Sequence, residues 1–146
     1  MKQKRTVRNV VALLCVTLVA SAVVAGSAVR RQPYEYPVVP GTEAWTELNG
    51  LDEMIAACAV DENRLEAMTT PALLETVLHY PLLVNIYAFS SAEQGIDSVS
   101  SYFAGLPMLL ARPDALSCME AYAQAEATAV EEQMYLKTLT QYLTEV

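Results

Sequence analysis

The single histidine of the chain, His79, is its one source of an imidazole for proton transfer. Hydrolases built on a Ser-His-Asp or Cys-His arrangement need such a group as proton carrier. His79 precedes Tyr80-Pro81, and a proline biases the residue before it away from the helical conformation. We therefore expect His79 at the C-terminal end of a helix, where it favours the negative end of the helix dipole, rather than in a catalytic centre.

The cysteines do not have the spacing of a metal site. Zinc sites combine cysteine and histidine at short spacing, whereas Cys58, His79 and Cys118 are far apart in the sequence. We therefore predict no metal and no cofactor. An oxidising compartment would allow Cys58 and Cys118 to pair, but both lie among small apolar residues of helical segments, where buried free thiols are common. We predict two free, buried thiols.

Adjacent carboxylates are the remaining candidates for catalysis, because glycoside hydrolysis can use two carboxylates without a histidine. Such pairs occur at Asp52-Glu53, Asp61-Glu62 and Glu131-Glu132. Neighbours on a helix point about 100° apart, and seventeen acidic residues make adjacency common by chance. We interpret the pairs as solvated helix faces and predict no catalytic residue.

Aromatic residues give the remaining indication of function. The chain has one tryptophan, Trp45, and eight tyrosines. Such side chains dominate binding hot spots, although most of them at helical core spacing are core residues. Tyr135 and Tyr142 lie seven residues apart in the last helical segment and so share one face. They are the residues we predict to line a binding groove for a protein partner.

The N-terminal residues, 1–31, have the pattern of an export signal. Residues 1–9 carry four positive side chains, and residues 10–29 carry no charge. Twenty residues are long enough to span a bilayer as an uncleaved anchor, while the small residues at 25–28 suit a cleaved signal peptide. Both alternatives place residues 32–146 outside the cytoplasm, because the positive cluster stays inside.

The charge of the remaining chain restricts its partners. The whole chain has a net charge of -8, but residues 32–146 contain three basic and seventeen acidic side chains, a net charge of -14. Binding nucleic acid requires clustered Lys and Arg, and so does binding anionic lipid head groups. We therefore predict no nucleic-acid partner, and membrane contact only through residues 10–29.

The elements that position these residues are predicted to be helices. Three prolines in residues 32–41 indicate an extended linker, and residues 42–146 have the helical periodicity of a single domain. Residues 82–89 are apolar on nearly every side, so we expect them to form a helix at the centre of the core. Ser90 with Glu93, and Thr128 with Glu131, have capping-box spacing.

Glycine and proline define the predicted ends of several helices. Thr70-Pro71 is typical of a helix start, and Gly105 with Pro107 should end a helix that runs to about Phe103. The sequence thus predicts an all-α fold: an irregular compact bundle of about six to eight short helices, closed by a longer amphipathic helix.

Several of these core and cap residues also form a spaced pattern over about residues 36–120. It comprises Pro40-Gly41-Thr42 with Trp45, Leu65 with Met68-Thr69-Thr70, Tyr80-Pro81-Leu82-Leu83, Tyr87-Ala88-Phe89, Phe103 with Gly105-Leu106, and Arg112 with Asp114-Ala115. In this pattern the chain resembles an uncharacterised family of small exported bacterial all-helical proteins. The resemblance implies an exported helical domain and brings no activity with it.

The sequence therefore favours a non-catalytic interaction module outside the cytoplasm, tethered to the membrane or secreted. One alternative is an enzyme that acts on an extracellular polymer such as cell-wall glycan through a carboxylate pair. The other is a structural subunit of an envelope complex.

Overall fold

The computed structural model describes residues 32–125 and 129–145, and within these ranges the chain is all-helical, as predicted, without a strand. The described part contains eight α-helices and one 3-10 helix, η1. Their bounds are α2 (Glu43–Thr46), α3 (Leu51–Ala57), α4 (Glu62–Ala67), α5 (Thr70–Leu78), η1 (Leu83–Ala88), α6 (Ala92–Ser100), α7 (Gly105–Leu110), α8 (Ala115–Ala123) and α9 (Val130–Glu145).

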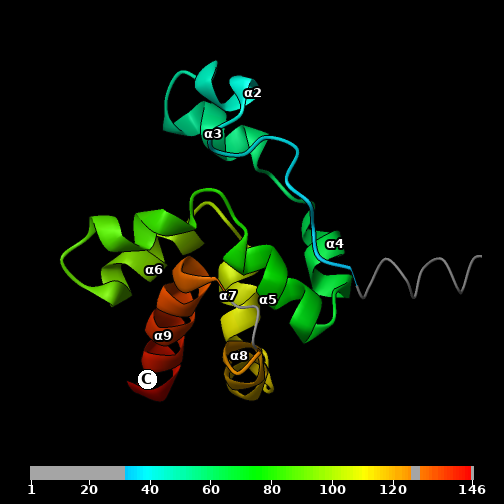
Figure 1. Ribbon diagram of the computed structural model, residues 1–146, viewed down its shortest axis with the longest axis vertical. Helices are drawn as coiled ribbons and strands as arrows, with labels where there is room; N and C mark the ends of the chain where they lie inside the picture. Colours follow the sequence, from blue (N-terminus) through cyan, green and yellow to red (C-terminus); the bar gives the residue numbers. More distant parts are fainter. Residues whose placement is uncertain (1–31, 126–128, 146) are drawn as a thin grey trace, which may run out of the picture.

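Helix α5 occupies the centre of the body (Figure 1) and packs against α7 and α8. Leu73, Leu74 and Val77 on this helix are completely buried. A helix this short with buried residues on most sides is stabilised by its neighbours rather than by its own propensity. Helix α9 packs on α8 and α6 and is the longest helix described, whereas α2 and α3 lie apart from this group at one end of the molecule.

The prediction that residues 82–89 are buried on every side is wrong. The run forms η1, in which residues three apart lie above one another because a 3-10 helix has three residues per turn. Leu83 and Ile86 therefore share the buried face, while Val84 and Tyr87 share an exposed one. The buried face lies against α6, where a Cβ on Gly95 would overlap the carbonyl group of Ile86.

Residues 32–41 are not helical, but they pack onto the domain instead of standing free. The backbone N–H of Tyr34 donates to Thr76 Oγ1 at 2.8 Å, and the Tyr36 hydroxyl donates to the Thr76 carbonyl oxygen at 3.0 Å. Tyr36 is buried, and the guanidinium of Arg64 lies 4.6 Å from the Tyr34 ring centroid. The segment predicted as a linker is thus anchored on α5.

Two predicted helix boundaries are shifted. Helix α6 is capped by Ser91, whose hydroxyl accepts from the Gln94 N–H, and not by Ser90. Helix α7 already begins at Gly105, so Gly105 and Pro107 start a helix where we expected a break. Pro107 fits in the first turn because an N–H at that position has no partner within the helix.

The export prediction concerns residues that lie outside the described ranges. Within residues 32–125 and 129–145, no helix is both long enough and apolar enough to cross a membrane. The segment 10–29 and Thr128, the predicted cap of the last helix, are not among the described residues.

Candidate functional site

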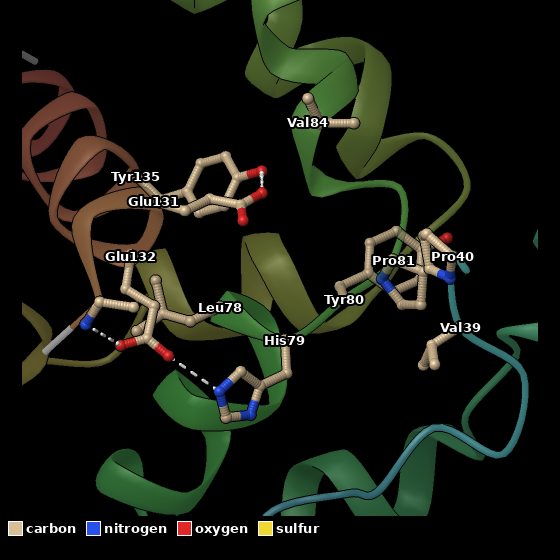
Figure 2. Close-up of a pocket in the computed structure, with 11 residues that line it drawn as sticks. Val39, Pro40, Leu78, His79, Tyr80, Pro81, Val84, Glu131, Glu132 and Tyr135 are labelled. Carbon is tan, nitrogen blue, oxygen red and sulfur yellow. Dashed lines mark hydrogen bonds and ion pairs between the residues drawn. The ribbon is translucent and has the colours of Figure 1, made fainter. Parts of the chain in front are cut away.

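A cleft of about 610 Å³ lies between the C-terminal end of α5 and the first turns of α9. It has the volume of a small-ligand or peptide side-chain site. In Figure 2, Glu131, Glu132 and Tyr135 enter from α9, whereas Val39, Pro40 and Pro81 form the opposite side. The remaining lining residues are Leu78, His79, Tyr80, Val84 and Ala129.

His79 lies at the edge of this cleft. Its backbone N–H donates to the Glu75 carbonyl as the C-cap of α5, so the predicted position at a helix end is confirmed. Its Nε2 lies 2.9 Å from Glu132 Oε1. Because a carboxylate only accepts hydrogen bonds, Nε2 is the nitrogen that donates to Glu132.

Glu132 is held by further hydrogen bonds. Its Oε2 accepts from the Ala129 N–H at 3.2 Å, the hydrogen bond that a glutamate three residues into a helix makes back to the cap. The Tyr122 hydroxyl also hydrogen-bonds to it. Burial, followed by the negative charges of Glu132 and Glu75 and by this hydrogen bond, raises the pKa of Tyr122. The capping interaction is therefore made by Glu132, one residue later than the predicted pair of Thr128 and Glu131.

Tyr135, one of the two predicted binding residues, is only 4% exposed. Its hydroxyl donates to Glu131 Oε1 at 2.9 Å, and its ring stacks on Tyr87 with the centroids 5.8 Å apart. Burial, followed by the hydrogen bond to Glu131, raises the pKa of Tyr135 above its ordinary value. Tyr135 thus acts as a neutral donor in the cleft wall, and little of its ring is available to a partner.

Tyr142, the other predicted binding residue, is half-buried at a different place. It lines two smaller hollows beside α6, one with Ser91 and Glu93 and one with Ile96 and Asp97. Seven residues advance a helix by about 10 Å, so the two tyrosines point in similar directions but contact different neighbours. The structure does not bring Tyr135 and Tyr142 into one groove.

The chemistry available in the cleft is limited. Glu132 orients the His79 imidazole much as a carboxylate does in a hydrolytic triad, but no Ser, Thr or Cys is among the described lining residues. Within the described part of the chain, no three His, Cys, Asp or Glu side chains are grouped to hold a metal ion. The cleft offers apolar contact, hydrogen bonds and negative charge, which are the properties of a binding site.

The other predicted groups have structural roles. The Asp61 side chain caps α4, and the Glu53 carboxylate accepts from the Asn49 N–H at 2.7 Å. Cys58 and Cys118 are both free, as predicted, although Cys118 is only partly buried. Burial raises the pKa of both thiols, which makes them poor nucleophiles.

Neither the cleft nor the pairing of His79 with Glu132 was predicted from the sequence. These residues are 53 positions apart, and no local pattern relates two groups that meet only by tertiary packing. In comparisons with protein families, curated proteins and solved structures, none matched this chain. The resemblance to exported helical proteins therefore stays a prediction.

Proposed function

We propose that residues 32–146 form a non-catalytic interaction module outside the cytoplasm, which residues 10–29 tether to the membrane or direct to secretion. The observation that supports binding is an exposed apolar surface, the η1–α9 patch, formed by Val84, Tyr87 and Met134. Their exposed fractions are 52%, 43% and 53%. Grouped apolar side chains that remain exposed are typical of protein interaction sites.

Hydrogen bonds connect the two elements that carry the η1–α9 patch. Val84 and Tyr87 share the exposed face of η1, and the Tyr87 hydroxyl lies 3.1 Å from Thr138 Oγ1 on α9. Thr138 in turn donates to the Met134 carbonyl one turn earlier. Because Tyr87 also stacks on Tyr135, the patch is continuous with the wall of the cleft.

Photo-crosslinking in the producing cells tests the proposal. A photoreactive phenylalanine analogue at position 87 should form a discrete adduct with a protein. The same analogue at Leu51, which is 48% exposed on α3, is the matched control. Equal labelling from both positions, or none from position 87, would contradict the binding function.

Protease treatment of intact cells tests the location, because an exported body should be digested while the cytoplasmic proteins survive.

The enzyme alternative requires hydrolysis of cell-wall glycan by the purified chain that is lost on Glu131→Gln or Glu132→Gln. The subunit alternative predicts an adduct that co-purifies as a stable assembly.

A further inference from the structure

We propose that the cleft between α5 and α9 binds a short peptide segment of the protein partner in which Lys or Arg is adjacent to a bulky apolar residue. This inference rests on the proposed function, since it specifies the chemistry of the partner. It is drawn from the apolar lining of the cleft, the charges at its edge and the charge of the body.

The apolar side of the cleft suits an aliphatic or aromatic side chain. Val39, Pro40 and Pro81 line this side (Figure 2), and Val84, which also lines the cleft, belongs to the η1–α9 patch. A volume of about 610 Å³ accommodates one or two side chains of a peptide rather than a folded domain. Burial of the apolar side chain supplies most of the affinity.

The opposite side of the cleft is negatively charged. Glu131 and Glu132 enter from the first turn of α9, and Glu131 is exposed. The groups described as donating to these carboxylates are the Tyr135 hydroxyl, the Tyr122 hydroxyl, the Ala129 N–H and His79. The Tyr135 hydroxyl satisfies the exposed Glu131 carboxylate without cancelling its charge, so the edge of the cleft at Glu131 favours a cationic side chain.

The three Lys and Arg residues of the described part lie elsewhere. Arg64 covers the Tyr34 ring, and Arg112 donates to the carbonyl oxygens of Glu66 and Met68. Lys137 lines a separate hollow between α8 and α9. None of the three is among the cleft residues, so no Lys or Arg of the described ranges neutralises the Glu131 carboxylate, which is available to a cationic side chain of a ligand.

The net charge of residues 32–146 disfavours two other ligands of the cleft, a second copy of the chain and an anionic lipid. A second copy of residues 32–146 would bring another net charge of -14 to the surface, and an anionic lipid would also be repelled. A cationic peptide is attracted at long range and gains specificity from the carboxylates. Its apolar side chain can then enter the cleft beside Val84.

Binding of blocked tetrapeptides to the purified full chain tests this inference. The probes are acetyl-Gly-Arg-Leu-Gly-amide, its Glu-for-Arg analogue and its Gly-for-Leu analogue, measured by NMR titration at low salt. We expect the Arg-Leu peptide to shift the resonances of His79 and Val84. The other two peptides should bind more weakly.

Two substitutions test which side of the cleft binds which side chain of the peptide. Glu131→Gln should weaken binding of the Arg-Leu peptide by up to about fivefold, since an exposed ion pair contributes at most about that much, and should not weaken binding of the Glu analogue, whose repulsion it relieves. Val84→Ser should weaken every peptide that contains Leu. Glu43→Gln, in the first turn of α2, and Leu51→Ser are the matched controls.

Equal binding of the Arg and Glu peptides, or binding that is unchanged in Glu131→Gln, would overturn the inference. Preferential binding of phosphatidylcholine or phosphatidylglycerol vesicles through the cleft would also overturn it, in favour of a lipid. A specific adduct from position 87 together with failure of the peptides would leave the proposed function standing and reject this inference alone.

Discussion

The imidazole of His79 and the carboxylate of Glu132 meet at 2.9 Å and join the end of α5 to the first turn of α9. Both groups are placed favourably, because a histidine complements the negative end of a helix and a glutamate complements the positive one. Glu132 also accepts from the Ala129 N–H. The Glu132 carboxylate therefore caps the start of α9 and fixes the position of α9, which forms one wall of the cleft, relative to α5.

Removing this carboxylate should destabilise the fold more than removing the imidazole. We expect Glu132→Ala to lower the free energy of unfolding by about 1 kcal/mol, since a helix-capping interaction is lost. His79→Ala should lower it by about 0–1 kcal/mol, because its side chain is half exposed. Thermal unfolding followed by circular dichroism measures both, with the exposed Glu47→Ala as control. A stability of Glu132→Ala equal to that of the native chain would contradict the capping role.

The elements with strong local signals were predictable from the sequence. Helix α5 ends at His79, as the restriction that Pro81 imposes on Tyr80 predicts. It begins at Thr70 with Pro71 in its first turn, close to the predicted start, although the N-cap is Thr69 and not Thr70. Helix α9 was expected from the spacing of Leu136, Leu139 and Leu143. These features depend on residues close in sequence.

The features that depend on tertiary packing were not predictable. An apolar run such as 82–89 does not reveal its helical period, and only the 3-10 geometry exposes Val84 and Tyr87 while it buries Leu83 and Ile86. The docking of Tyr34 and Tyr36 on Thr76 joins residues about 40 positions apart. The candidate cleft combines three such distant segments, so it could not be predicted from the sequence.

Gly95 should be indispensable for the contact between α6 and η1. A methyl group at this position would overlap the Ile86 carbonyl, which is backbone and cannot turn aside. We expect Gly95→Ala to lower the free energy of unfolding by about 1–3 kcal/mol, although alanine favours helices. Urea unfolding measures the effect, with the exposed Gln94→Ala as the control within about 0.5 kcal/mol of the native chain. An unchanged or raised stability of Gly95→Ala would show that the contact is looser than described.

Thr76 should control the docking of the N-terminal segment of the body. Its Oγ1 is buried, accepts from the Tyr34 N–H and donates to the Ala72 carbonyl. Thr76→Val keeps the shape but leaves that N–H without its acceptor, which costs about 1–3 kcal/mol. Limited proteolysis should therefore cut near residues 34–40 faster in this variant than in the exposed control Thr144→Val. Equal cleavage rates would mean that the ring contacts alone hold the segment.

Alkaline pH should unfold the body through its buried tyrosines. Burial is the largest cause that raises the pKa of Tyr36, Tyr80 and Tyr135 above the ordinary value of 10.0. Because the native state favours the neutral phenol, this stabilisation is fully present below about pH 10. It is lost as the pH rises from there towards the raised native pKa values. Absorbance at the tyrosinate band should show these three buried tyrosines ionising together with the loss of helical circular dichroism. Ionisation of all eight tyrosines in one step near pH 10, with the helices intact, would be incompatible with the packing of Tyr36 against Tyr80.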